Sequence, residues 1–344
     1  MPGLAWSMLV GAGLTLGSAG GAFAETPQIA PARGPILVEG SFGFAGDADD
    51  VEDLRRAASG VACPRTDACL VVFDEGAEAR MIELGPDGAV VARPEPLALA
   101  ARGEVDAEGA ATDGAMIYVV GSHAMKRSSC AANPASRVVL RAPVAADGRL
   151  QLPFEARTLS SLLEAEQLGG EANPLAGSLG KCLGAEGGID IEGVAILDGR
   201  LWFGLRGPTQ GAQVGILSVE ADAFFADGDP APRLDWVGAS DRRGLRDLTA
   251  DGAGGLLLLV GPDDRPENAD AGWALLRWDG ESAEASPLAE LDLSKIDRRT
   301  DLDGCDDAKK VLDRKPEAIH VQGDSVMVLS DGLCDGGLSW FNLP

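Results

Sequence analysis

The sequence predicts an all-β fold, a single β-propeller of five blades, from three observations. Glycine (46) and proline (20) are abundant among the 344 residues, whereas aromatic residues make up only 5%. This mix is typical of short strands joined by tight turns. Hydrophobic residues make up 45%, which is enough to form a core. One residue pattern also recurs five times, as the repeats of a propeller do. A β-sandwich is the alternative.

Each repeat starts with a small or acidic residue, continues as an apolar hairpin with a Gly or Asp turn, and ends on a polar residue. The starting residues are 49, 84, 55 and 70 positions apart, and a four-stranded blade takes about 40–50 residues. Each interval therefore holds one blade plus an insertion. The longest insertion predicts a short helix over residues 159–168, and six blades are the alternative if it hides a degenerate blade.

The N-terminal 24 residues are expected to be a signal peptide. They end in Ala22-Phe23-Ala24, which resembles a cleavage site, although the first basic residue is only Arg33. A single transmembrane anchor is the alternative. Residues 25–56 form an N-terminal segment whose residues 36–39 are expected to close the last blade, and residues 57–344 form the propeller domain. We expect a periplasmic or secreted protein.

The six cysteines all follow the signal peptide, and their even number predicts structural disulfides in an exported protein. Six cysteines allow 15 pairings, so the connectivity is an inference. Cys63 and Cys69 flank a short loop, and Cys305 and Cys334 share the C-terminal segment. That leaves Cys130 with Cys182. A metal site is the weaker alternative because there is no C-x-x-C motif and there are only two histidines.

The charge balance excludes some partners. Asp and Glu total 54 against 29 Lys and Arg, a net charge of −25. A field of this sign repels nucleic-acid phosphates and anionic lipid, so we expect no nucleic acid and no membrane contact beyond the signal peptide. The chain also lacks a phosphate-binding G-x-x-x-x-G-K-[ST] loop and a G-x-S-x-G nucleophile elbow. We expect a monomer.

Propeller geometry predicts where the polar ends of the repeats meet. The first strand starts, and the second strand ends, at the same mouth of the central channel. The column of starting residues is Ser59, Glu108, Glu192, Asp247 and Glu317. The column of ending residues is Asp74, Ser122 with His123, Arg206, Gly261 and Asp331. Arg246 and Lys315 lie next to this rim, and a loop from Asp263 to Glu267 is expected on the same face.

Four carboxylates at one mouth repel each other unless cations lie between them. A closed ion-pair ring with Arg206, Arg246 and Lys315 is one interpretation, with a structural role only. The functional interpretation is that the carboxylates Glu108, Glu192, Asp247 and Glu317 bind Ca²⁺ through their oxygens. The other basic and polar rim residues would hold a small anionic ligand or substrate; they are Arg206, Arg246, Ser122, Lys315, Asp74 and Asp331. His123 is a candidate general acid or base if it turns into the mouth.

Four short motifs carry a resemblance to a known family. They are Gly121-Ser122-His123, Gly204-Leu205-Arg206-Gly207-Pro208, Gly244-Leu245-Arg246-Asp247-Leu248 and Lys315-Pro316-Glu317. They resemble signatures of a bacterial propeller family of unknown function, which is similar to exported propellers with esterase-like or phytase-like activity. The resemblance covers residues 57–340. It implies export and a calcium-assisted ester or phosphoester hydrolase, carried by Glu108, Glu192, Asp247, Glu317, Arg206 and Arg246. The first repeat has Ser59 at the starting position where the others have a carboxylate, so the expected acidic ring is interrupted there.

The sequence therefore leaves three hypotheses for function. The first is a hydrolase of small anionic esters or phosphoesters that uses Ca²⁺ at the mouth. In that case Glu108, Glu192, Asp247, Glu317 and His123 are the catalytic candidates. The second is a non-catalytic propeller of the cell envelope that binds a ligand or partner over the same mouth. The third is a structural ion-pair ring, with the function elsewhere on the surface.

Overall fold

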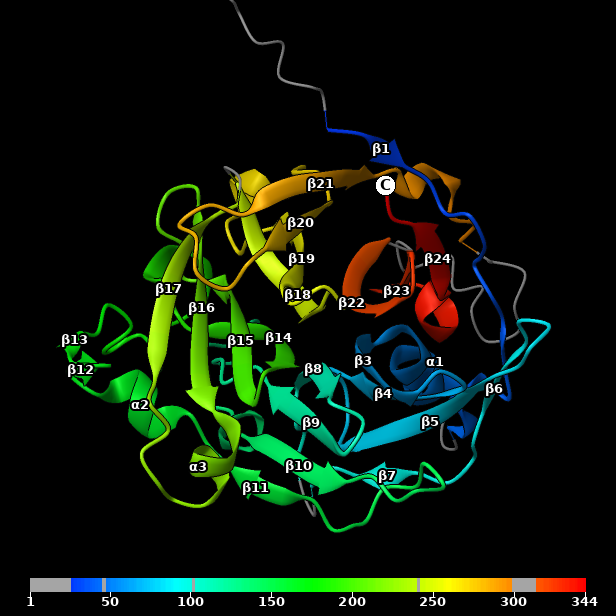
Figure 1. Ribbon diagram of the computed structural model, residues 1–344, viewed down its shortest axis with the longest axis horizontal. Helices are drawn as coiled ribbons and strands as arrows, with labels where there is room; N and C mark the ends of the chain where they lie inside the picture. The colour runs from blue at the N-terminus through cyan, green and yellow to red at the C-terminus, as the bar shows by residue number, and fades with distance from the viewer. Residues whose placement is uncertain (1–25, 45–47, 101–102, 240–241, 299–313) are drawn as a thin grey trace, which may run out of the picture.

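Five sheets surround a central axis in the computed structural model, which describes residues 26–44, 48–100, 103–239, 242–298 and 314–344 (Figure 1). Each sheet is one blade, so the predicted five-bladed propeller is confirmed. The first strand of each blade lies innermost, and the next strands pair antiparallel outward. Because the repeats share this order, their polar starting residues come together around the axis.

The blades follow one another along the chain. Blade 1 contains β3 (Ala58–Arg65), β4 (Ala68–Phe73), β5 (Glu78–Leu84) and β6 (Val90–Ala92), with β7 (Leu97–Ala98) beside β5. Blade 2 contains β8 (Ala107–Thr112), β9 (Met116–Gly121), β10 (Val139–Pro143) and β11 (Glu155–Arg157). Blade 3 contains β14 (Asp190–Leu197), β15 (Arg200–Gly207), β16 (Gln213–Glu220) and β17 (Arg233–Gly238). Blade 4 contains β18 (Arg243–Ala250), β19 (Leu256–Pro262), β20 (Ala274–Trp278) and β21 (Ser286–Leu291). Blade 5 contains β22 (Lys315–Gln322), β23 (Ser325–Asp331) and β24 (Ser339–Asn342).

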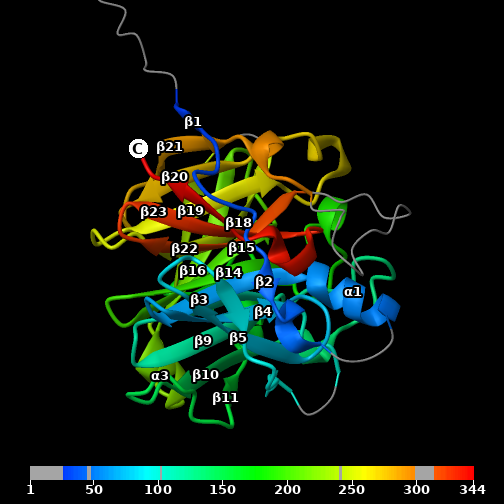
Figure 2. The same cartoon turned by 90° about the vertical axis from the view of Figure 1, so that its right-hand side faces the viewer.

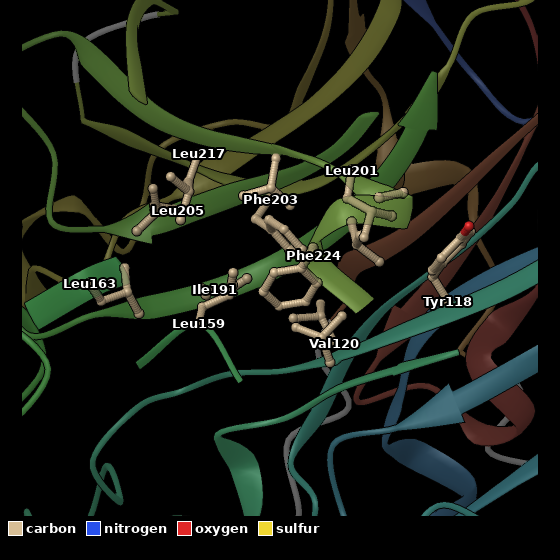
Figure 3. Close-up of a cluster of buried hydrophobic side chains, with 14 of the residues drawn as sticks. Tyr118, Val120, Leu159, Leu163, Ile191, Leu201, Phe203, Leu205, Leu217 and Phe224 are labelled. Carbon is tan, nitrogen blue, oxygen red and sulfur yellow. The ribbon is translucent and has the colours of Figure 1, made fainter. Parts of the chain in front are cut away.

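The core lies between the blades. Strands near the axis are covered on both faces by the neighbouring blades. β4, the second strand of blade 1, is therefore a continuous apolar run that is buried along its whole length. Figure 3 shows one interblade cluster, in which Val120 of blade 2 lies near Ile191 and Phe203 of blade 3. Leu159 and Leu163 from the long insertion complete this cluster. The insertion is therefore anchored to the core between these two blades.

The long insertion contains the predicted helix, but the helix is shorter than expected. It is α2 (Ser160–Glu164), followed by a small hairpin of β12 (Gln167–Leu168) and β13 (Glu171–Ala172). Within the described residues these elements do not form a sixth blade. The other helices are α1 (Ala48–Arg56), α3 (Ala221–Phe225), and the 3-10 turns η1 (Ser41–Gly43), η2 (Pro134–Ser136), η3 (Gly184–Glu186), η4 (Pro266–Asn268), η5 (Leu293–Lys295) and η6 (Cys334–Gly337).

The N-terminal segment joins the ends of the ring. It pairs with blade 4 through β1 (Gln28–Ile29) and with blade 1 through β2 (Val38–Glu39), both in parallel. Between them, Ala32 and Ile36 donate backbone hydrogen bonds to Trp340 and Leu338 of blade 5. Figure 2 shows the segment passing along the side of the molecule from β1 to β2. The last blade is thus completed by residues 32–36. The predicted closure of the last blade by the N-terminal segment is confirmed, but of residues 36–39 it is Ile36 that bonds to blade 5, whereas Val38 and Glu39 pair with blade 1.

Among the described residues, the structure contains two of the three predicted disulfides. Cys63 is bonded to Cys69, and Cys130 is bonded to Cys182. Cys305, the predicted partner of Cys334, lies outside the described residues, as does the predicted signal peptide. Such bonds are typical of oxidising compartments.

No helix among the described residues is both long and apolar enough to cross a membrane.

Candidate functional site

A β-bulge interrupts every innermost strand at the same place. In each blade the pairing with the second strand shifts by one residue, which leaves that residue without a partner in the ladder. The five unpaired residues are Ser59, Glu108, Glu192, Arg246 and Glu317. Four of these are charged. The five bulges therefore bring three carboxyl groups, one guanidinium and one hydroxyl together at one mouth of the central channel.

The residue after each bulge packs against the next blade. A Cβ on Gly109 would lie 2.7 Å from the backbone nitrogen of Val194, and one on Gly193 would lie 2.7 Å from the Cα of Asp247. Asp247 holds this position in blade 4. Its two carboxylate oxygens accept hydrogen bonds from the backbone N–H groups of Ile319 (2.7 Å) and Leu248 (2.8 Å).

Asp247 was thus assigned to the wrong column. We expected it to start the fourth repeat and to face the mouth, but Arg246 occupies the bulge there. The error arose because an acidic residue fits the sequence pattern of the other starting residues, while the bulge register is visible only in the strand pairing. Burial raises the pKa of Asp247 well above its ordinary value, although the two N–H groups favour the ionised form. Its role is to join two blades.

A cavity of about 1070 Å³ lies over the ring of bulge residues. We call it the mouth cavity. Of the predicted site residues, it is lined by Asp74, Glu108, Glu192, Arg206, Arg246, Lys315, Glu317 and Asp331. The loop of Asp263, Asp264 and Arg265 also lines it, as expected. Other charged residues that line the cavity were not predicted from the sequence, namely Glu75, Glu104, Asp106, Lys126, Arg127, Asp190 and Arg314. Glu75 directly follows Asp74, a signal that the repeat already contained.

One half of the mouth cavity is a network of arginines and acids. Arg246 is buried, and its Nε lies 2.8 Å from Glu317 and 3.3 Å from Glu192. Arg206 pairs with Glu192 at 2.9 Å and with Asp264 at 3.1 Å. The guanidinium groups that were expected to hold an anionic ligand therefore already hold carboxylates of the chain.

The same network separates the pKa values of two neighbouring glutamates. Burial acts to raise the pKa of Glu192, but the charges of Arg246 and Arg206 outweigh it and lower the pKa to about 2. Burial raises the pKa of Glu317 to about 8, although Arg246 opposes this change, and the charge of Glu192 adds to it. Of the two, Glu192 is the stronger acid.

Arg127 extends the network across the rim. It pairs with Asp190 at 3.0 Å and with Asp264 at 2.8 Å. Arg127 lies three residues before Cys130, which is bonded to Cys182. The disulfide and the two ion pairs connect loops of blades 2, 3 and 4 above the cavity.

The other half of the mouth cavity is acidic. Ser59 donates a hydrogen bond to Glu108 (Oγ to Oε2, 2.7 Å), and burial raises the pKa of Glu108 well above its ordinary value, helped by the charges of Glu192 and Asp106. Burial also raises the pKa of Asp74, and Asp331 adds to this effect. The Oδ1 atom of Asp74 is buried and has no hydrogen-bond partner among the described residues. We call Asp74, Asp106 and Glu108 the acidic half.

Ser122 and His123 do not line the mouth cavity. Both are buried, and Ser122 donates a hydrogen bond to Asp106. The Nδ1 of His123 donates to the carbonyl of Gly121 at 2.9 Å, and its Nε2 accepts from the N–H of Leu159 at 3.2 Å. Burial lowers the pKa of His123 to about 4. This neutral ring fixes the start of the insertion, and its position outside the mouth cavity does not support the expected role as a general acid or base.

The four carboxylates expected to hold Ca²⁺ do not fit a calcium site here. Calcium needs six to eight oxygen ligands at one point. Glu192 and Glu317 face Arg246, and both oxygens of Asp247 accept backbone N–H groups, so Glu108 is the one carboxyl of the set without such partners. Among the described residues, the one convergent group of potential ligands is Cys130, Cys182 and Glu186, and its two sulfurs form a disulfide.

Comparisons with known proteins identify a family but no activity. A sequence profile described as "Protein of unknown function (DUF3616)" matches residues 92–141 and 172–332. A search of curated proteins finds no match.

Solved structures similar to this chain include other proteins of low sequence identity. A structural genomics protein of unknown function from Bacteroides thetaiotaomicron is 11% identical with a TM-score of 0.41, covering 84% of this chain and 70% of its own. Virginiamycin B lyase from Staphylococcus aureus, as a catalytically inactive variant with quinupristin, is 10% identical with a TM-score of 0.37, covering 85% and 97%. A putative 6-phosphogluconolactonase from Bacteroides uniformis is 11% identical with a TM-score of 0.37, covering 79% and 64%.

Proposed function

The chain belongs to the DUF3616 family of proteins of unknown function, and we propose that its mouth cavity binds a small ligand that carries positive charge. One observation carries this proposal. Among the described residues the cavity is lined by eleven carboxyl-bearing and seven basic side chains, and the buried arginines are already paired with acids of the chain. Asp74 and Glu108 have no basic partner among the described residues.

The electrostatics of the acidic half support a cation. Burial disfavours the charged forms of Asp74 and Glu108 because they lose their hydration. An ammonium group beside them would favour the ionised forms and restore the balance of charge. Binding would then be coupled to proton release from these carboxyls. The net charge of −25 would also attract a cation toward the molecule.

An anionic ligand, which the sequence favoured, is less compatible with this geometry. To hold it, Arg206 and Arg246 would have to exchange Glu192, Glu317 or Asp264 for the ligand. Each exchange leaves a buried carboxylate unpaired, and breaking a buried pair costs about 3–5 kcal/mol. We therefore favour the binding propeller over the hydrolase of anionic substrates.

Hydrolysis of a neutral or cationic ester is a second candidate function, and one observation favours it. Glu108 lines the cavity, and burial favours its protonated form. Such a carboxyl can act as a general acid. Turnover of p-nitrophenyl acetate that is lost in Glu108→Gln would support it. The same assay with p-nitrophenyl phosphate or phytate, with and without Ca²⁺, tests the phytase-like activity implied by the resemblance.

The binding proposal is tested by thermal unfolding of the protein with spermidine, phytate or Ca²⁺. The experiment is done at 0.15 M salt, where attraction between exposed charges is screened. We expect spermidine to raise the Tm and phytate to have no effect. Glu108→Gln should reduce the rise, whereas Glu95→Gln, at an exposed position, should not. A rise with phytate but not with spermidine would contradict the proposal, and a rise with Ca²⁺ alone would favour a metal.

We also propose that the protein acts outside the cytoplasm, in the periplasm or as a secreted monomer. The two disulfides support an oxidising compartment. Cell fractionation tests the location, and light scattering of the purified protein tests the monomer.

A further inference from the structure

A second cavity, of about 740 Å³, lies at the outer edge of the propeller between blades 2 and 3. We call it the outer cavity. Its walls come from the region of η2, from β11, and from the neighbourhoods of α2 and α3. Figure 1 shows β11, α2 and α3 at the edge of the molecule, far from the central axis. It shares no lining residue with the mouth cavity. The two cavities are therefore separate sites.

Arg137 lines the outer cavity without a counter-ion. It is half-buried, and its guanidinium donates to the carbonyl of Leu179 at 3.2 Å and lies 3.7 Å from the sulfur of Met125. Its Nε is buried without an acceptor, and no carboxylate among the described residues forms an ion pair with it. In a chain with 54 acidic and 29 basic residues, a part-buried cation without a carboxylate is unexpected. Its field favours an anion in the cavity.

The surroundings of Arg137 indicate the kind of anion. Arg157 supplies a second guanidinium, which donates to the backbone carbonyls of Phe225 (2.5 Å) and Ala156 (3.0 Å). Its contacts with the carboxylates of Glu155 (3.4 Å) and Asp227 (3.3 Å), of which Asp227 also lines the cavity, are longer than a short charge-assisted hydrogen bond. The hydroxyls of Thr158 and Ser161 also line the cavity. The remaining walls are mainly apolar and include Pro134, Val138, Leu162, Phe224 and Pro230.

We infer that the outer cavity binds a small organic acid, with its carboxylate held by Arg137 and its apolar body against the wall formed by Phe224 and Leu162. A guanidinium holds a carboxylate through two parallel hydrogen bonds, which gives both affinity and orientation. Ligand pockets commonly combine such a polar anchor with apolar walls. A free inorganic anion would use the anchor but leave the apolar wall unused.

Benzoate is the probe, with benzamide and acetate as its matched controls. Calorimetric titration of the full chain should show benzoate binding at one site. Benzamide, which has the body without the charge, and acetate, which has the charge without the body, should each bind at least about tenfold more weakly, because a charge-assisted hydrogen bond and ring burial are each worth that much. Equal binding of acetate and benzoate would overturn the apolar part of the inference, and absence of benzoate binding would overturn all of it.

Variants locate the site. Arg137→Gln should weaken benzoate binding about tenfold or more, and Arg137→Lys should weaken it less because the charge remains. Arg149→Gln is the matched control, since Arg149 is exposed and pairs only with Asp147 at 3.7 Å among the described residues. Circular dichroism shows whether each variant is folded. If benzoate binding survives in folded Arg137→Gln but is lost in Glu108→Gln, the acid binds at the mouth and the inference is wrong.

Discussion

At the residue scale, one step of register decides whether a side chain faces the mouth cavity or the next blade. Arg246 and Asp247 are neighbours in sequence, but Arg246 lines the cavity and Asp247 bonds to the backbone of blade 5. The charge pattern of the repeats predicted a polar ring at this mouth. It could not assign these two residues, because a β-bulge changes the face without changing the composition.

Replacing Asp247 by Ala should therefore destabilise the fold without weakening the binding of spermidine. The N–H of Ile319 loses its acceptor, and an unsatisfied buried donor costs about 1–3 kcal/mol. Urea denaturation measures the loss, and the thermal shift with spermidine should stay as large as in the wild type. Unchanged stability together with loss of the thermal shift with spermidine would show that Asp247 contributes to binding at the mouth cavity and does not join the blades.

Arg246 should be far more sensitive than an exposed arginine. Arg246→Met leaves Glu192 and Glu317 without their shared partner, which we expect to cost about 3–5 kcal/mol. Arg93→Met breaks an exposed pair with Glu83 and should cost about 0–1 kcal/mol. Urea denaturation of both variants makes the comparison. Similar losses in the two variants would show that the buried network does not stabilise the ring.

At the scale of elements, the innermost strands of blades 1, 2 and 3 approach the next blade so closely that the residue after the bulge is glycine (Gly60, Gly109 and Gly193). The apolar runs predicted the strands, and the 159–168 segment predicted a helix that the structure places at residues 160–164. The short strand at Val38–Glu39 was assigned to the wrong blade. Two residues carry too little pattern to select a partner, so tertiary contacts decide their pairing.

Gly193→Ala tests this close approach. Its Cβ would meet the Cα and Oδ1 of Asp247 at 2.7 Å, so blades 3 and 4 would have to separate. We expect a loss of about 1–3 kcal/mol or more, as for other overpacked sites. Gly180→Ala is the matched control, because its Cβ would meet no atom within 4 Å. Equal stability of the two variants in urea would contradict the interblade packing described here.

At the scale of the whole molecule, the ring is joined by the N-terminal segment, which pairs with blades 4, 5 and 1. Blade number and mouth position could be predicted from the sequence because the repeats are local and periodic. The kind of ligand that the mouth cavity binds could not be predicted in this way. The arginines expected at the rim suggested anion binding by Arg206 and Arg246, whereas the fold pairs these arginines with the chain's own acids. Such pairing over long sequence separations is visible only in three dimensions.

The buried acids also predict how stability depends on pH. Burial raises the pKa values of Glu108, Asp190 and Asp247 in the fold, so the folded chain keeps protons that the unfolded chain releases above its ordinary values of 4.5 (Glu) and 3.8 (Asp). The free energy of unfolding should therefore fall as the pH rises from about 5 to about 8. Glu192 has the opposite effect, because its pKa in the fold is lowered to about 2. The stability that its ionised form contributes should be lost as the pH falls below 4.5.

Urea denaturation at pH 5 and pH 8 measures this dependence. Glu108→Gln should show a smaller difference between the two pH values, because it removes one of the raised carboxyls. Glu95→Gln, at an exposed position, should behave as the wild type. Stability that increases from pH 5 to pH 8 would contradict the raised pKa values of these carboxyls.

The proposal that the acidic half of the mouth binds a cation is tested most directly by calorimetric titration of the protein with spermidine at pH 6. Two buffers of different ionisation enthalpy reveal the protons exchanged on binding. We expect binding with proton release, and a smaller release in Glu108→Gln, because the cation favours the ionised forms of Asp74 and Glu108. Proton uptake on binding, or no binding of spermidine by a protein that binds phytate, would contradict it.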